Sequence, residues 1–113
     1  MNLKNYQGII AETAVFPKEI GLLYCGLGLC GEAGEVAEKV KKLYRDSDGV
    51  ITEEFKQALA KEMGDVIWYL TAMAEIIGIS MEEILQINYD KLMARKATST
   101  LHGSGDDREV TNG

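Results

Sequence analysis

Apolar residues recur along the chain with a helical period, and this pattern predicts an all-α protein. Four segments carry the pattern, approximately residues 3–15, 19–44, 52–77 and 80–96. No segment shows the alternation of apolar and polar positions that is typical of a β-strand. We therefore expect a four-helix bundle-type protomer built from these four helices.

Start and stop signals define several of the helix boundaries. The first segment stops before Pro17, because proline disfavours helical backbone in the residue that precedes it. Thr52 is placed to cap the third segment, and Gly78 follows its last apolar residue, where a left-handed residue is common. Ser80 and Glu83 form an S-x-x-E capping box, which marks the start of the fourth segment.

The third segment contains a stretch, residues 66–70, in which every residue is apolar. A helix that is apolar on all sides is buried on all sides, and a chain of this size has few elements to cover it. We therefore expect a homo-oligomer, either a homodimer or a tetramer formed as a dimer of dimers. A well-covered monomer is the alternative.

We expect residues 1–96 to form one all-α domain. Residues 97–113 are rich in Gly, Ser, Thr and Asp. They are expected to form a flexible C-terminal tail, or a segment that orders on a ligand and closes over it.

The composition is that of a globular protein, with 113 residues of which 46% are hydrophobic and 27% charged. The net charge of −6 disfavours duplex nucleic acid as a partner, because a protein that binds a phosphate backbone needs a positive surface. The longest apolar run, residues 66–79, is interrupted by Glu75 and is too short for a membrane span. No signal peptide is recognisable, so we expect free thiols at Cys25 and Cys30 and a cytoplasmic protein.

Two pairs of acids supply the candidate chemistry. Glu32 and Glu35 form an E-x-x-E pair, and Glu62 and Asp65 form an E-x-x-D pair. Residues three apart share one face of a helix. In an antiparallel hairpin that turns near residues 46–49, both pairs would lie roughly 15 Å from the turn, at ~1.5 Å per residue. The four carboxylates would then converge, and such oxygen ligands suit Mg²⁺, with Mn²⁺ as an alternative.

Their positions on the helices distinguish these acids from ordinary surface acids. On a helical projection Glu62 falls within the apolar arc of its helix, and Asp65 and Glu32 lie at the edges of such arcs. A buried carboxylate needs a cation, a hydrogen-bond partner or a raised pKa. A salt bridge to Lys39 or Lys61 is the alternative to a metal ion, although one bridge would satisfy only one acid.

Two further patterns point away from other kinds of site. Residues 26–31 match G-x-G-x-x-G, but no strand is predicted before them, so we expect these glycines to permit close helix packing or ligand approach. The chain has one histidine, His102, which lies in the tail. A di-iron helical bundle uses Glu-x-x-His pairs, so a di-iron centre is not expected.

The chain resembles the MazG-like all-α nucleotide pyrophosphohydrolases over most of its length. The motifs that carry the resemblance are G-L-C-G-E-A-G-E-V-A-E-K-V-K-K, K-E-M-G-D-V-I-W-Y-L, G-I-S-M-E-E-I, N-Y-D-K-L-M-A-R-K and the closing H-G-S-G-D-D-R. The resemblance implies Mg²⁺-dependent hydrolysis of a nucleoside triphosphate, usually a deoxynucleotide, to the monophosphate and pyrophosphate. It also implies that Glu32, Glu35, Glu62 and Asp65 are the metal ligands.

Two acids are candidates for the catalytic role. Glu35 or Glu38 would orient or deprotonate the attacking water, and a metal ion lowers the pKa of such a water. Glu38 follows Glu35 by three residues and therefore extends the same row. A solvated surface acid is an equally good interpretation of Glu38.

Polar residues of the fourth helix are candidates for binding the substrate. Asn88, Lys91 and Arg95 are spaced three or four apart and share a face. Spacing alone is typical of a solvated face, whereas the resemblance implies that Lys91 and Arg95 bind phosphate and that Asn88 contacts the sugar or base.

Aromatic and tail residues complete the set of candidates. Tyr69 either stacks on the base or sugar or belongs to the core, and Trp68 is expected in the core or in an interface. Asp107 and Arg108 either close over the triphosphate or belong to a disordered tail. Asp107 stands where the family often has asparagine, so the chain departs from the family pattern at that position.

Three functions remain open at this level. The first is a (deoxy)nucleoside triphosphate pyrophosphohydrolase that removes unwanted nucleotides. The second is a related enzyme that acts on phosphoribosyl-ATP through the same metal site. The third is a non-catalytic helical adaptor whose acids hold a structural metal. The presence of Asn88 and Lys91 together with the four acids favours an enzyme, because a scaffold has no need of phosphate-binding groups.

Overall fold

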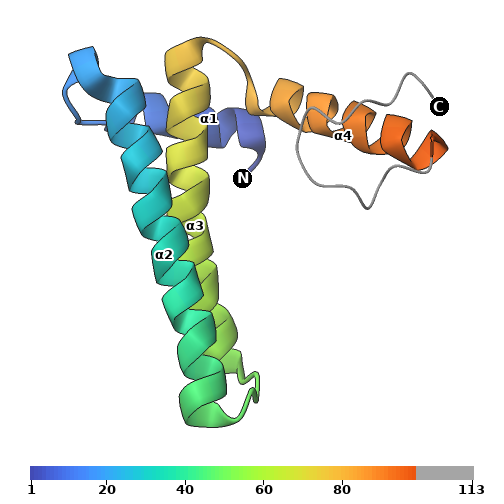
Figure 1. Ribbon diagram of the computed structural model, residues 1–113. Coiled ribbons are helices and arrows are strands. Elements are labelled where there is room, and N and C mark those ends of the chain that lie inside the picture. Colours follow the sequence, from blue (N-terminus) through green and yellow to red (C-terminus); the bar gives the residue numbers. More distant parts are fainter. Residues whose placement is uncertain (99–113) are drawn as a thin grey trace.

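The computed structural model describes residues 1–98, and every regular element in that range is helical (Figure 1). The elements are α1 (Leu3–Thr13), a short 3₁₀ helix η1 (Lys18–Ile20), α2 (Gly21–Ser47), α3 (Glu53–Ile77) and α4 (Met81–Ala97). The prediction of an all-α chain with four helices is therefore confirmed. The candidate tail residues His102, Asp107 and Arg108 lie outside the described residues.

The predicted capping residues occupy the expected positions. The Thr52 hydroxyl accepts a hydrogen bond from the Phe55 N–H at 3.1 Å, and the Ser80 hydroxyl accepts one from the Glu83 N–H, also at 3.1 Å. Gly78 ends α3 with a φ of 76°, a left-handed conformation that glycine adopts without steric cost. The start of α3 and the corner between α3 and α4 are thus determined by local sequence.

Helix α2 extends further than predicted, to Ser47 instead of Tyr44. Asp48 adopts the left-handed conformation with a φ of 53°, and the Gly49 N–H donates to the Leu43 carbonyl at 3.0 Å. This bonding pattern closes the C-terminus of the helix after Ser47. Aspartate is one of the few residues other than glycine that tolerate this conformation, and the turn therefore begins later than its composition suggested.

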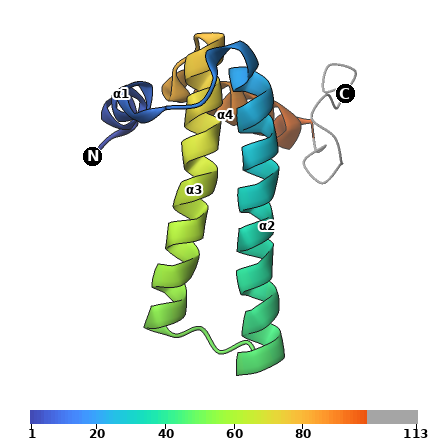
Figure 2. The same cartoon turned by 90° about the vertical axis from the view of Figure 1, so that its left-hand side faces the viewer.

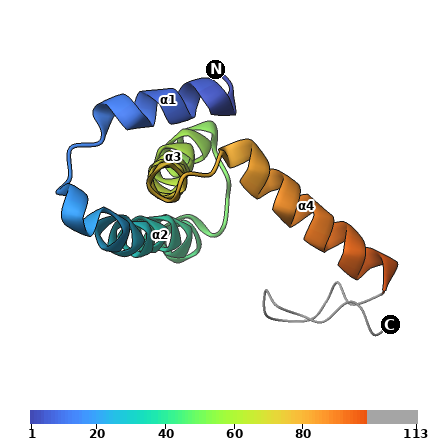
Figure 3. The same cartoon turned by 90° about the horizontal axis from the view of Figure 1, so that it is seen from above.

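Helices α2 and α3 form a long antiparallel hairpin and lie side by side along their length (Figures 1 and 2). Helix α1 packs across α3 on the side opposite α2 (Figure 3). The buried centre lies where these three helices meet, at Ile10, Cys25 and Ala72. Partly buried side chains packed around it are Tyr6, Phe16, Trp68, Tyr69 and Met73.

Helix α4 leaves the end of α3 at an angle of 101° and packs against α1 (Figures 1 and 3). Gln7 on α1 holds this corner, because its amide group donates to the Ile79 carbonyl and accepts from the Met81 N–H, both at 3.0 Å. The four helices of one chain therefore do not close into the predicted bundle. The radius of gyration is 17.2 Å, whereas a compact domain of this length has a value of about 13 Å.

The chain leaves much of its apolar surface uncovered. Ile67 and Leu70, from the stretch predicted to be buried on all sides, are 43% and 41% exposed. A shallow apolar groove of about 300 Å³ runs between α2 and α3 beside them. The residues that line this hairpin groove are Ala33, Val36, Met63, Val66 and Ile67.

The segment from Lys18 to Ser47 is long and apolar enough, by composition, to be compatible with a membrane span. The same length and composition are found in core helices of soluble proteins, so this feature is weak evidence for a membrane. The segment also carries Glu32, which belongs to the candidate site described next, and Glu35 one turn further along.

Candidate metal centre

The hairpin brings three of the four predicted acids together. Glu32 on α2 and the pair Glu62 and Asp65 on α3 each offer a carboxylate oxygen, and these oxygens lie within 4.8 Å of one another. Glu32 and Glu62 are half-buried, while Asp65 is exposed. The prediction that acids from two antiparallel helices meet at the same level holds for these three residues, which we call the acid cluster.

Glu35 lies one turn further along α2, is exposed and is not part of this close group. It is nevertheless near enough to influence the cluster electrostatically. The pKa of Glu32 is raised, first by partial burial and then by the negative charges of Asp65, Glu62 and Glu35. All four predicted acids therefore share one negative region, with three of them in direct reach of a single ion.

The acid cluster fits a hard divalent cation. Its donors are all carboxylate oxygens, which Mg²⁺ and Mn²⁺ prefer over softer ligands. Within residues 1–98 no basic side chain forms an ion pair with the three clustered acids, so the predicted alternative of a salt bridge to Lys39 or Lys61 is absent there. Converging carboxylates without a basic partner repel one another, and a bound cation would relieve that repulsion.

Glu38 has a different environment. Its carboxylate lies 3.0 Å from the Lys41 ammonium and 4.0 Å from that of Lys42. The hydrogen bond from Lys41 is the main reason that the pKa of Glu38 is lowered. These contacts favour the interpretation of Glu38 as a surface acid over its role as a second catalytic candidate.

A small hollow of about 320 Å³ adjoins the acid cluster and is lined by Glu32, Asp65, Trp68 and Tyr69. The half-buried ring of Tyr69 packs on the core and also borders this hollow, so it belongs to the core and is placed where it could contact a ligand. Burial raises the pKa of Tyr69 most strongly, and Glu32 and Asp65 are among the groups that raise it further. Trp68, expected only in the core or an interface, forms part of the same wall.

Tyr6 is a neighbour of the site that sequence reasoning did not identify. Its pKa is raised by burial and then by the charge of Asp65, so the first helix reaches the edge of the acid cluster. Tyr6 precedes the buried Ile10 by four residues, and this spacing could have indicated that it faces the hairpin.

The predicted substrate-binding residues of α4 are not brought to the acid cluster within one chain. Asn88, Lys91 and Arg95 lie on the helix that turns away from the hairpin at 101°. Figure 3 shows α4 extending from the corner in a direction that does not pass over α2. The groups predicted to bind phosphate and the groups predicted to bind metal therefore belong to separate parts of the chain.

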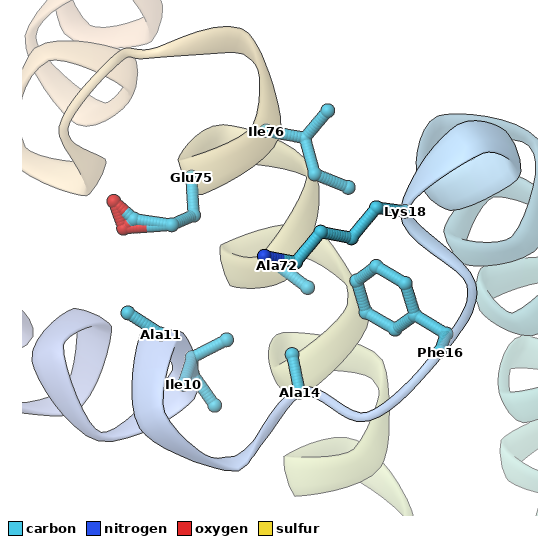
Figure 4. Close-up of a pocket in the computed structure, with 8 residues that line it drawn as sticks. All are labelled: Ile10, Ala11, Ala14, Phe16, Lys18, Ala72, Glu75 and Ile76. Atoms are coloured by element: carbon cyan, nitrogen blue, oxygen red, sulfur yellow. The ribbon is translucent and has the colours of Figure 1, made fainter.

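A second hollow of about 420 Å³ lies between α1, the linker that follows it and α3 (Figure 4). Its lining is mostly apolar, with one lysine and one glutamate: Ile10, Ala11, Ala14, Phe16, Lys18, Ala72, Glu75 and Ile76. Phe16 meets Trp68 edge-on, with ring centroids 6.4 Å apart, and Trp68 lines the hollow beside the acid cluster. The second hollow contains none of the clustered acids. The hollow beside the acid cluster is lined by two of them, Glu32 and Asp65.

Fold and site together define a class of protein: an all-α chain in which two antiparallel helices present clustered carboxylates suited to a divalent cation. The comparison with known families agrees with this class. The MazG nucleotide pyrophosphohydrolase domain matches residues 23–99, which is more than half of the chain and includes all four predicted acids. The chain therefore belongs to the MazG nucleotide pyrophosphohydrolase family, as its motifs had indicated.

Two relatives show how far the similarity extends. The Gene 37 protein of Mycobacterium phage L5 is 42% identical over 114 residues, which covers 96% of this chain and 100% of that protein. The uncharacterized protein YvdC of Bacillus subtilis (strain 168) is 35% identical over 72 residues, which covers 59% of this chain and 68% of that protein. No solved structure gives a significant match.

Proposed function

We propose that this protein hydrolyses a (deoxy)nucleoside triphosphate to the monophosphate and pyrophosphate, with Mg²⁺ as cofactor and Mn²⁺ as an alternative. One observation carries the proposal. Glu32, Glu62 and Asp65 converge within 4.8 Å in a chain of this family, and no basic side chain within residues 1–98 neutralises them. A role in removing unwanted nucleotides is consistent with this activity.

The acids have separate roles in this proposal. Glu32, Glu62 and Asp65 would hold the cation, with Glu35 as the fourth ligand predicted from the sequence. A bound divalent cation neutralises phosphate charge and lowers the pKa of a coordinated water. Glu35 is the better candidate to accept the proton of the attacking water, because Glu38 already forms an ion pair with Lys41. Water attacks one of the two phosphorus atoms joined by the oxygen between the α- and β-phosphates, and Glu35 accepts the proton of the water. The bond from that phosphorus to the bridging oxygen breaks, and the leaving group takes the electron pair, which gives the monophosphate and pyrophosphate.

Substrate binding requires groups from other elements. We expect Tyr69 to contact the base or sugar from the wall of the hollow, and Asn88, Lys91 and Arg95 to bind sugar and phosphate. Because α4 points away from the acid cluster of its own chain, a second copy is the simplest source of these groups. A homodimer, or a tetramer built from such dimers, would also cover the apolar hairpin groove. We expect the protein to act in the cytoplasm on free nucleotides, since its net charge of −6 disfavours duplex nucleic acid.

A panel of nucleotides assayed with Mg²⁺ tests the proposal, with pyrophosphate and orthophosphate measured separately. Pyrophosphate should be the first product, and orthophosphate in its place would contradict the proposed cleavage position. Including phosphoribosyl-ATP in the panel identifies the related activity if that compound is the better substrate. Absence of turnover on every compound, with Mg²⁺ bound, would favour the non-catalytic adaptor.

Two matched variants link turnover to the acid cluster. Glu62→Gln removes one negative ligand and should lower kcat/KM by at least about 100-fold. Mutation of residues that only support metal ligands already lowers metal affinity or activity by about 10–100-fold. Glu54→Gln makes the same chemical change in the first turn of α3, outside the acid cluster, and should leave turnover close to wild type. Helical circular dichroism should be unchanged in both.

A further inference from the structure

The ring of Tyr69 lies directly on the backbone of α2 at Gly28. A Cβ atom at position 28 would overlap the Tyr69 Cε1 and Cζ atoms and would lie 2.8 Å from Cδ1. Carbon atoms at such separations are deep inside their repulsive range, so the ring can occupy this place only while position 28 has no side chain. The overlapping atoms belong to a rigid ring, so the whole ring would have to move to make room.

The other glycines of the same motif do not have this property. A Cβ atom at Gly26 or Gly31 would find no atom within 4 Å, and the same is true of Gly34. Within the motif the overlap is therefore particular to Gly28. Elsewhere in α2, a Cβ atom at Gly21 would lie 3.0 Å from the Phe16 Cε1 atom, which is close but not an overlap of this size. The contact with Tyr69 gives the central glycine of G-x-G-x-x-G a steric role in place of phosphate binding.

The contact lies one helical turn from the acid cluster on both helices. Gly28 precedes Glu32 by four residues on α2, and Tyr69 follows Asp65 by four residues on α3, so each is about 6 Å along its helix from a clustered acid. Tyr69 and Trp68 pack edge-to-face, with centroids 5.1 Å apart and an interplanar angle of 81°. Both residues line the hollow beside the acid cluster.

We propose that Gly28 is a positioning residue, which seats the Tyr69 ring against α2 so that the hollow beside the acid cluster stays open for the sugar or base of the nucleotide. The inference deepens the proposed function and rests on it for the identity of the ligand. Addition of a methyl group at position 28 displaces the ring from α2, and the ring then occupies part of the hollow. The acids themselves keep their places, so substrate binding changes while cation binding does not.

The test compares Gly28→Ala with Gly26→Ala, the same change two residues away where there is open space. We expect Gly28→Ala to raise KM about tenfold, the equivalent of a lost aromatic contact of roughly 1.4 kcal/mol, with kcat and Mg²⁺ affinity near wild type. Gly26→Ala should change none of the three. On a Tyr69→Ala background, Gly28→Ala should have no further effect on KM, because the group through which it acts is gone.

Tryptophan fluorescence supplies a readout that does not depend on activity. Trp68 is the sole tryptophan of the chain and packs on Tyr69, so displacement of that ring should shift its emission in Gly28→Ala and not in Gly26→Ala. Equal emission and equal KM in the two variants would overturn the inference. If the wild type hydrolyses no nucleotide, the proposed function fails, whereas the emission comparison still decides whether Gly28 seats the ring.

The double variant covers the case in which Gly28→Ala does not fold. Removal of the ring in Gly28→Ala/Tyr69→Ala removes the overlap, so this variant should recover the helical circular dichroism of Tyr69→Ala. Failure of the double variant to recover it would show that Gly28 acts through something other than Tyr69, and the inference would be overturned.

Discussion

At the scale of single residues, Glu32 is the acid through which the proposed cation binding would affect the stability of the protein. Its pKa is raised by partial burial and by the charges of the neighbouring acids, so its ionised form is destabilised in the folded chain without metal. An acid with a raised folded-state pKa favours folding when protonated, and this contribution is lost as the pH rises through the folded-state pKa. A bound cation reverses the preference because it needs the ionised form.

Glu32→Gln should therefore have opposite effects in the two conditions. In a chelator at neutral pH the variant should unfold at a higher temperature than wild type. This difference in unfolding temperature should shrink as the pH falls towards the ordinary glutamate pKa of about 4.3. Mg²⁺ at about 100 times its Kd should stabilise wild type by about 2.7 kcal/mol, and the variant by much less. Thermal unfolding followed by circular dichroism measures both effects, and a variant less stable than wild type in chelator would contradict the prediction.

The two candidates for the catalytic role should behave differently. Glu35→Gln should lower kcat by at least about 100-fold, the lower limit for loss of a general base. Glu38→Gln removes a surface ion pair with Lys41 and should leave kcat within about twofold of wild type, because exposed pairs contribute little. Steady-state kinetics on the best nucleotide decides between them. The reverse ranking of the two variants would transfer the water-activating role to Glu38.

At the scale of helices, local signals predicted boundaries well and orientations poorly. Thr52, Gly78 and Ser80 act through bonds and dihedral angles within a few residues, so the sequence is sufficient to place them. The level at which the acids meet follows from helical rise alone, and Glu32, Glu62 and Asp65 meet as expected. The direction of α4 could not be predicted, because its apolar residues are spread around the helix and mark no face that must pack on the hairpin.

The corner between α3 and α4 offers a test of the backbone argument. Gly78→Ala should destabilise the protein by about 1–2 kcal/mol, since the position needs a φ of 76° and an alanine pays for that conformation. Space is not the cause, because a Cβ there would have no neighbour within 4 Å. Gly8→Ala is the matched control in the interior of α1, also in open space, and should stabilise by up to about 1 kcal/mol. Urea unfolding measures the change in the free energy of unfolding for each variant, and changes of the same sign would refute the argument.

At the scale of the whole molecule, one chain has an open shape in which the candidate groups lie apart. The acid cluster is on the hairpin, whereas the basic candidates Lys91 and Arg95 are on α4, and the apolar hairpin groove faces outward. A stable interface with a second copy would bury that groove and bring a cationic helix to the acids. The apolar stretch at residues 66–70 led us to expect an oligomer. In one chain, Ile67 and Leu70 of this stretch remain exposed.

Mixing two inactive variants tests whether sites are shared between copies. Glu62→Gln and Lys91→Ala each damage a different half of the proposed site. Suppose that α4 of one copy completes the acid cluster of another in a two-fold dimer. Subunit exchange at equal concentrations then makes half of the dimers mixed, and each mixed dimer has one intact site of its two. The mixture should therefore recover about a quarter of wild-type activity. No recovery after exchange verified by mass spectrometry would assign both halves to the same chain. Analytical ultracentrifugation gives the number of subunits.

The amide of Gln7 bonds to Ile79 and Met81 in the bend that follows α3, so the course of the last helix depends in part on a residue near the start of the chain. Asn88, Lys91 and Arg95 consequently take their positions in part from a helix that contains none of them. Substitution of Gln7 is therefore expected to change the direction of α4, and with it the positions of these three side chains, without altering any residue of the acid cluster. Divergence of substrate preference among related chains would then be recorded in the first helix, at a residue that is not among the groups proposed to contact the nucleotide.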